Sequence, residues 1–166
     1  MAMHRSTDLD HADTVATAVL GCTLPKAAWT HEAHLAFGYA AVRRHGVMDA
    51  LPILRASIRR YNESTGVANT ESSGYHETLT AYYCGAVALL QRDGQLLDDV
   101  VVHALTSRVA PFEYWDRDVL MATPARLRWL EPARPLAFDA EFAASSGTGR
   151  SATDGADGAD LVLREL

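Results

Sequence analysis

The chain has 166 residues, of which 48% are hydrophobic and 22% are charged, so a single domain can bury a core without disulfides or a structural metal. Fifteen basic against 21 acidic residues give a net charge of −6, which argues against a nucleic-acid-binding protein, because such proteins normally carry a basic face. Cys22 and Cys84 form no CxxC pair or disulfide framework, and no apolar stretch is long enough to cross a bilayer. We therefore expect a cytoplasmic protein with neither a signal peptide nor a membrane partner.

Apolar residues at spacings of three and four predict a run of amphipathic helices joined by short connections. In chain order the expected helices are Leu9–Leu20, Thr30–His45, Met48–Ser64, Ser73–Arg92, Leu96–Val109 and the short Thr123–Glu131. Thr30 is a typical N-cap, and Gly46 is a typical residue to end a helix. Because no segment alternates as a strand does, we predict an all-α fold of five to six helices in an orthogonal or bundle-like packing.

Two segments fall outside these helices. The polar connection over residues 65–74 is the longest internal loop, and long polar loops in compact domains often serve function. From Ala143 to Asp160, every residue except Arg150 is Ala, Gly, Ser, Thr or Asp, so ordering this stretch would bury almost no apolar surface. We predict one helical domain over residues 1–142 and a flexible tail over residues 143–166.

Three histidines lie near the starts of two expected helices. His31 and His34 are one turn apart on one helix face, and His76, followed directly by Glu77, faces the core in its own helix. If the two helix ends pack together, the three imidazoles converge, and neutral imidazole binds Zn, Fe, Cu and Ni. The pattern predicts a divalent metal ion held by His31, His34 and His76, with Glu77 as a fourth ligand or as a general base.

Two alternatives to the metal site remain open at this stage. In a metal-free enzyme, His76 and Glu77 perform acid/base catalysis on a small organic substrate, in a condensation, cyclisation or isomerisation. In a protein without a site, the imidazoles only satisfy free N–H groups at the helix starts.

Five further residues are candidates for binding a substrate, because they place polar or aromatic groups near the expected loop. They are Arg59, Arg60, Asn62, Asn69 and Tyr75. Either arginine is suited to bind a substrate carboxylate. The alternative is a solvated helix end followed by a loop that its Asn side chains tie down.

Three stretches carry a resemblance to a known group of proteins: Trp29–Leu35, Ile58–Asn62 and Gly74–Leu79. Over roughly residues 22–132 the chain resembles small, mostly uncharacterised bacterial helical proteins that combine THxxHL, RRYN and GYHET motifs. The resemblance implies that the three histidines and Glu77 belong to one site. The high content of Ala, Arg, Asp and Gly favours a GC-rich bacterial source, in which proteins of this kind are associated with natural-product biosynthesis.

We therefore predict a bacterial enzyme that acts on a small molecule through a His/His/His/Glu site with a divalent metal centre, in a natural-product tailoring role. The metal-free acid/base enzyme is the first alternative, and a non-catalytic module that binds a small ligand is the second. The expected partner is a small-molecule substrate, with no nucleic acid and no membrane, and the sequence leaves open whether the chain forms a homodimer.

Overall fold

The structure, a computed structural model, describes residues 2–145 of the chain. Within this range every regular element is a helix and no strand is present, which confirms the predicted all-α fold. The α-helices are α1 (Ala2–Leu20), α2 (His31–Ser64), α3 (Glu77–Arg92), α4 (Leu97–Val102), α5 (Arg117–Leu120), α6 (Thr123–Leu127) and α7 (Glu141–Ser145). Short 3-10 helices, η1 (Lys26–Ala28), η2 (Ala104–Thr106) and η3 (Ala110–Glu113), lie in the connections. None of the helices described has the length and apolar character needed to span a bilayer.

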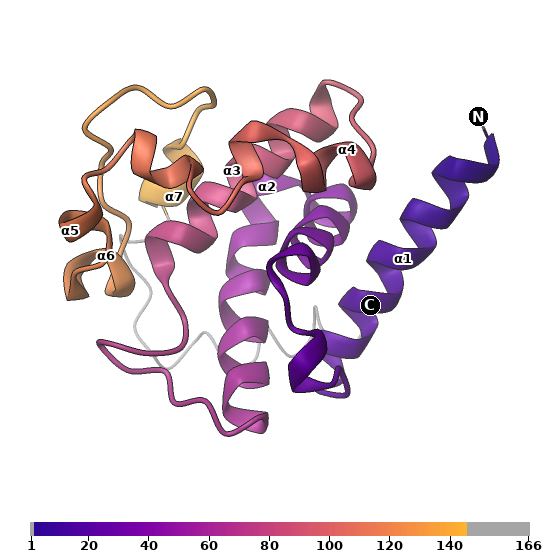
Figure 1. Ribbon diagram of the computed structural model, residues 1–166, viewed down its shortest axis with the longest axis horizontal. Helices are drawn as coiled ribbons and strands as arrows, with labels where there is room; N and C mark the ends of the chain where they lie inside the picture. The colour runs from indigo at the N-terminus through magenta and orange to yellow at the C-terminus, as the bar shows by residue number, and fades with distance from the viewer. Residues whose placement is uncertain (1, 146–166) are drawn as a thin grey trace.

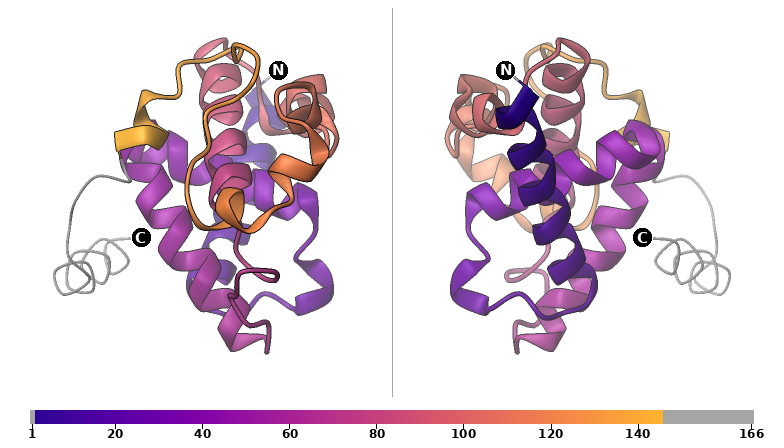
Figure 2. Two further views of the ribbon diagram at one scale, coloured as in Figure 1. Left: turned by 90° about the vertical axis from the view of Figure 1, so that its left-hand side faces the viewer. Right: turned by 90° about the vertical axis from the view of Figure 1, so that its right-hand side faces the viewer.

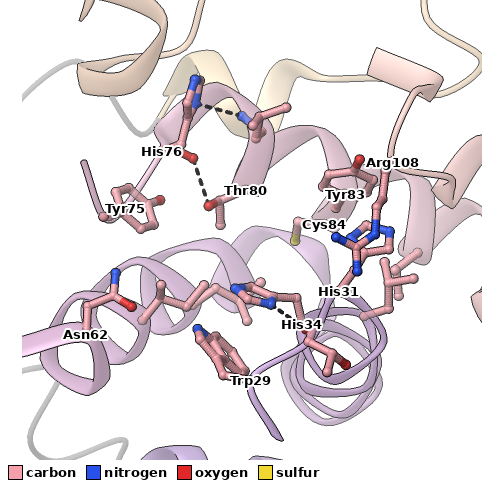
Figure 3. Close-up of a pocket in the computed structure, with 18 of the residues that line it drawn as sticks. Trp29, His31, His34, Asn62, Tyr75, His76, Thr80, Tyr83, Cys84 and Arg108 are labelled. Carbon is pink, nitrogen blue, oxygen red and sulfur yellow. Dashed lines mark hydrogen bonds between the residues drawn. The ribbon is translucent and has the colours of Figure 1, made fainter. Parts of the chain in front are cut away.

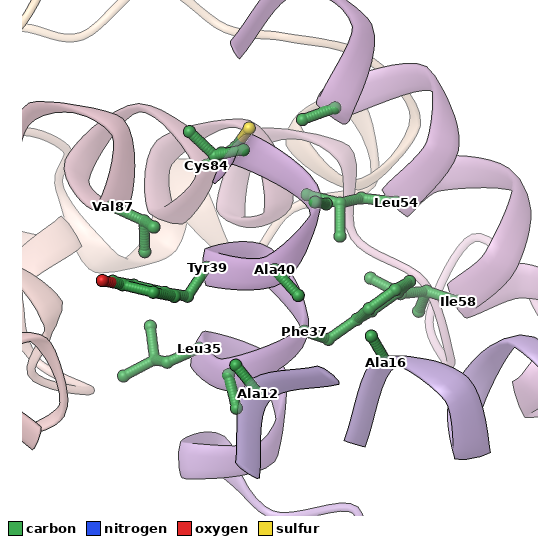
Figure 4. Packing of buried hydrophobic residues seen from close by; sticks show 14 of the residues in the cluster. Ala12, Ala16, Leu35, Phe37, Tyr39, Ala40, Leu54, Ile58, Cys84 and Val87 are labelled. Carbon is green, nitrogen blue, oxygen red and sulfur yellow. The ribbon is translucent and has the colours of Figure 1, made fainter. Parts of the chain in front are cut away.

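The main core lies where α2 packs against both α1 and α3 (Figure 1). Phe37 of α2, which is 1% exposed, packs toward Ala16 of α1 and Ile58 of the later part of α2 (Figure 4). Val87 brings α3 into the same cluster. Each large apolar side chain buried in this way stabilises the fold by about 1.5–3 kcal/mol, so this cluster supplies the main driving force for folding.

Helix α2 consists of two arms that meet at Gly46. The sequence predicted separate helices on either side of this residue, and the backbone of α2 leaves the helical conformation there, at φ 74° and ψ 163°. Glycine adopts a positive φ without a steric penalty, so the chain changes direction at this point (Figure 1). The first arm begins with Thr30, whose side chain accepts a hydrogen bond from the Ala33 N–H, as expected of an N-cap.

Helix α3 begins at Glu77, and the prediction that it begins at Ser73 is wrong. Gly74 has a φ of 75°, and a Cβ atom at this position would lie 2.6 Å from the carbonyl oxygen of Ala68. The chain therefore makes a tight left-handed turn before the helix. His76 follows with an extended backbone (φ −137°) and serves as the N-cap of α3.

Helix α4 ends at Val102, whereas the sequence predicted a helix as far as Val109. His103 has an extended backbone (φ −69°, ψ 145°), and its Nδ1 accepts a hydrogen bond from the Leu105 N–H. This side-chain cap starts η2 and so ends the preceding helix. Likewise α6 ends at Leu127 and not at Glu131.

A second cluster covers the side of α3 remote from α1. Tyr82 of α3 packs edge-on against the ring of Trp115, and Leu120 of α5 is completely buried beside them. The segment between α6 and α7 passes over α3 (Figure 2), where the ring of Phe138 approaches Gly85. Gly85 leaves room for that ring, because a Cβ atom there would lie 2.2 Å from it.

The end of the domain extends slightly beyond the predicted boundary. Helix α7 continues to Ser145, and its residues Phe142 and Ala143 are 4% and 2% exposed. The first three residues of the predicted tail therefore belong to the folded domain, because Phe142 draws this short helix onto the core. The rest of the predicted tail, residues 146–166, lies outside the described residues.

Candidate functional site

A cavity of about 620 Å³ lies between the two arms of α2, the loop before α3 and the first half of α3 (Figure 3). Its apolar wall is formed by Trp29, Leu35, Leu54, Ile58, Leu79 and Val87. Its polar lining is formed by Thr30, His31, His34, Asn62, Tyr75, His76, Thr80, Tyr83 and Arg108. This volume and this mixture of an apolar wall with a few polar groups are typical of a site for a small molecule.

His34 is the most exposed of the three imidazoles, and it lines this cavity. Its Nδ1 donates to the carbonyl oxygen of Thr30 over 2.7 Å, which leaves Nε2 as the proton-accepting nitrogen of the neutral ring. The ring stacks on Trp29 with 3.7 Å between centroids, so its orientation is fixed. In Figure 3 a dashed line leaves one ring nitrogen of His34, and the other nitrogen lies on the opposite side of the ring.

The protein around His34 keeps it in the neutral form. Desolvation, with smaller contributions from the charges of His31 and Arg108, lowers the pKa of His34 to about 4, against the hydrogen bond to Thr30, which raises it. At pH 7 the ring therefore carries no charge, and Nε2 holds a free lone pair. A neutral imidazole in a fixed tautomer is suited to accept a proton from a bound molecule.

His31 joins the start of α2 to η2. Its Nε2 donates to the carbonyl oxygen of Thr106 over 2.7 Å, and its ring packs edge-on against Tyr83 at 5.1 Å. Tyr83 in turn donates its hydroxyl hydrogen to the carbonyl oxygen of Ser107 over 3.1 Å. Burial raises the pKa of Tyr83 to about 12, so the phenol stays protonated at pH 7. These two side chains hold one rim of the cavity in place.

His76 reaches the cavity wall, but the protein uses both of its ring nitrogens. Nε2 donates to the carbonyl oxygen of Leu120 over 2.9 Å, and Nδ1 accepts from the Leu79 N–H over 3.3 Å. Desolvation is the main cause that lowers the pKa of His76, so the ring is neutral. In this arrangement His76 acts as a helix cap and ties α3 to α5, and it presents no free lone pair to a ligand.

The predicted ligand set of His31, His34 and His76 does not come together around one point. Within residues 2–145, no group of three or more His, Cys, Asp or Glu side chains is placed to hold a metal ion. The physical reason lies in the helix starts. The imidazoles of His31 and His76 each turn to a carbonyl oxygen of another segment, and that of His34 turns to Thr30.

Glu77 does not line the cavity, although the sequence predicted a ligand or general base there. Its carboxylate accepts hydrogen bonds from Nε and Nη2 of Arg55, at 2.9 and 2.6 Å, and from the Tyr75 hydroxyl at 2.8 Å. This ion pair raises the pKa of Arg55, and burial raises the pKa of Tyr75. With three donors bound, the Glu77 carboxylate serves to join the start of α3 to α2.

The predicted arginines and Asn69 also lie outside the cavity lining. The guanidinium of Arg59 lies over the ring of Tyr75, 4.6 Å from its centroid, and that of Arg60 donates to the carbonyl oxygen of Leu20. Asn69 donates to the carbonyl oxygen of Arg59 over 2.9 Å and to a carboxylate oxygen of Glu63. The contacts of Asn69 fix the loop to α2, and the contact of Arg60 joins α2 to the end of α1.

Asn62 lines the cavity, yet its amide is also part of the loop anchor. Its Nδ2 donates to Oδ1 of Asn69 over 3.0 Å, and the same oxygen accepts the Tyr75 N–H. Asn62 therefore lines the cavity and also, through Asn69, holds the loop that carries Tyr75 against the cavity wall.

Arg108 is a cavity residue that the sequence analysis missed. It lies in the short segment between η2 and η3, inside the stretch predicted to be helical as far as Val109, and no recognisable motif marks it. Trp29 was quoted only as part of a motif, and it forms the surface on which His34 stacks. Cys84 also lines the cavity, and burial raises the pKa of its thiol to about 12, so it is an inert part of the wall.

Comparisons of the chain with protein-family models, with curated proteins and with solved structures found no match.

Proposed function

We propose that this protein is a metal-free acid/base enzyme that acts on a small organic molecule, with His34 as the proton acceptor. The observation that carries the proposal is the state of His34. The Nδ1–H of this imidazole is bound to Thr30, which selects one tautomer, and the ring stacks on Trp29. Desolvation lowers its pKa, although the side chain keeps contact with solvent, and the ring lines a cavity with a largely apolar wall. A preoriented neutral base in a site of this kind is the arrangement that proton abstraction requires.

In the proposed step, Nε2 of His34 takes a proton from a carbon next to a carbonyl group of the substrate. The C–H electron pair becomes the carbon–carbon double bond of an enolate, and the carbonyl oxygen takes up the negative charge. The imidazolium then returns the proton to another carbon or to the oxygen, so the ring is neutral again at the end of the cycle. Isomerisations, cyclisations and condensations that pass through an enolate begin with such a step.

The second candidate function is a binding module without catalysis. It is favoured by the way the protein uses its own polar groups: His76, Tyr83 and Thr80 all donate to backbone carbonyl oxygens. A wall whose hydrogen bonds are already made holds an apolar ligand and does little chemistry on it.

Deuterium exchange separates the two functions. The protein is incubated in D₂O with a panel of small ketones and β-keto acids, and NMR follows deuterium incorporation at the carbon next to the carbonyl group. We expect exchange faster than in buffer for the wild-type chain, and loss of this acceleration in His34→Gln. The control His11→Gln changes an exposed histidine remote from the cavity lining and should leave the rate unchanged.

Two results would contradict the proposal. If compounds bind in the cavity with no accelerated exchange in the wild-type chain, the binding module is correct. If the acceleration survives in His34→Gln, another group is the base. Metal analysis of the same samples checks that the exchange does not follow the content of a bound ion.

A further inference from the structure

The charged groups that line the cavity indicate a class of substrate. Arg108 is the single Asp, Glu, Lys or Arg side chain among the residues that line it. No acidic side chain shares this lining, so the cavity offers one fixed positive charge beside an apolar wall. A molecule with a single negative charge and an apolar body is complementary to this arrangement.

Arg108 is held at the cavity rim by contacts on the two residues directly before it. The carbonyl oxygen of Thr106 accepts from His31, and the carbonyl oxygen of Ser107 accepts from Tyr83. Both donors themselves line the cavity, so the backbone next to Arg108 is fixed to the cavity wall. The side chain of Arg108 is exposed, so the fixed backbone places the base of this side chain at the cavity while the guanidinium keeps its own freedom to reach a ligand.

The guanidinium itself remains available to a ligand. Among residues 2–145, no hydrogen bond or ion pair joins it to a partner side chain. Its charge lowers the pKa of Glu32, after the larger effects of hydrogen bonds to the Glu32 backbone and to Thr30. Glu32 is exposed and does not line the cavity, whereas Arg108 does.

The position of Arg108 relative to His34 also orients the ligand. In Figure 3, Arg108 lies at one side of the cavity, Asn62 and Tyr75 lie at the other, and His34 lies between them. A ligand whose negative group binds Arg108 extends its body along the apolar wall and over His34. The atom that meets His34 is then in the body of the molecule, away from its charged end.

We propose that the substrate is a small monocarboxylic acid with an apolar body, and that Arg108 binds its carboxylate. A planar carboxylate matches the guanidinium, which can donate two parallel hydrogen bonds to it. This inference rests on the proposed active site at His34, because it names the substrate class of that same cavity.

Calorimetry with matched probes tests the inference directly. The probes are 4-phenylbutyrate, 1-naphthaleneacetate and the uncharged primary amide of each acid. For the wild-type chain we expect at least one acid to bind about 10-fold or more tightly than its amide, because a hydrogen bond to a charged group is worth more than a neutral one. In Arg108→Gln this preference should fall to less than about 3-fold.

A matched control uses Arg92, which is exposed at the end of α3 and does not line the cavity. Arg92→Gln removes the same charge from the whole molecule, so it should keep the preference for the acids. Equal binding of acid and amide by the wild-type chain overturns the inference, and so does a preference that survives in Arg108→Gln. If neither acid saturates the protein at millimolar concentration, the inference is overturned as well.

These results are independent of the deuterium exchange that tests His34. A preference for the acids that depends on Arg108, without accelerated exchange, leaves the ligand class standing and refutes the enzyme. Accelerated exchange that depends on His34, without a preference for the acids, supports the enzyme and refutes the proposal that Arg108 binds a carboxylate.

Discussion

Replacement of Glu77 by glutamine tests whether this carboxylate holds the fold together, in place of the catalytic role that the sequence predicted. Glu77 is 5% exposed and accepts from two nitrogens of Arg55 and from the hydroxyl of Tyr75. Glutamine keeps the shape of the side chain but removes the negative charge. Its amide group then faces the donors of Arg55, so at least one hydrogen bond is lost and a cation is left without its partner.

The size of the effect follows from the burial of the two partners. Removing one member of a buried ion pair costs about 3–5 kcal/mol, chiefly because the remaining charge is left uncompensated. The side chain of Arg55 is 26% exposed, so water can partly replace the lost partner. We therefore expect the free energy of unfolding to fall by about 2–4 kcal/mol. For a chain of this size, the melting temperature should drop by roughly 5–15 °C.

Urea denaturation followed by circular dichroism measures this change, with Asp93→Asn as the control. Asp93 pairs with Arg92 at 3.4 Å on the surface, where the two side chains are 53% and 74% exposed. Removing an exposed pair should change the free energy of unfolding by less than about 1 kcal/mol. The reasoning is refuted if Glu77→Gln is as stable as the wild-type chain, since the carboxylate would then contribute nothing to the fold.

Three further predictions follow from local geometry. Gly74→Ala should lower the free energy of unfolding by about 2–3 kcal/mol in urea denaturation. The residue has a φ of 75°, and an added Cβ would lie 2.6 Å from the Ala68 carbonyl oxygen. A variant as stable as the wild-type chain would contradict this prediction. Gly85→Ala should cost about 1–2 kcal/mol despite the better helix propensity of alanine, because the Phe138 ring must move, and the added change Phe138→Leu should recover part of the loss. Folding lowers the pKa of His34 from 6.5 to about 4, so between these pH values the unfolded chain binds a proton on His34 that the folded chain does not bind. The free energy of unfolding should therefore fall as the pH decreases from 6.5 toward 4. His34→Gln should make that decrease shallower, and an unchanged slope would show that the imidazole is not held neutral.

The all-α fold of this protein follows from patterns within short stretches of its sequence. Apolar spacing marked the three long helical stretches, Thr30 capped α2 as expected, and Gly46 broke the chain direction where a glycine can adopt a positive φ. These features depend on interactions within a few residues, so the sequence alone was sufficient to predict them.

Helix ends that depend on side-chain caps were harder to predict. His76 and His103 each accept a backbone N–H and so set a boundary, at the start of α3 and after α4. Histidine is not a common cap, and nothing in the local pattern distinguishes a capping imidazole from one that faces a ligand.

The candidate site was only partly visible in the sequence. His31 and His34, which the sequence placed one turn apart on one helix face, both line the cavity, His34 as an exposed side chain and His31 as a half-buried one. Their partners come from distant segments: Thr106 lies 75 residues from His31, and Leu120 lies 44 residues from His76. Those partners decide which ring nitrogens are free, and therefore what chemistry each histidine can perform.

Only the tertiary structure decided the roles of the charged residues. Arg55, which carried no motif, neutralises Glu77, while Arg59 lies over the ring of Tyr75 and Arg108 lines the cavity. Spacing along a helix fixes which face a charge occupies, but the segment that packs on that face is chosen by the fold as a whole. The sequence therefore determined the helices. The packing of α2 against α3 and against η2 determined which polar groups are satisfied and which remain available to a substrate.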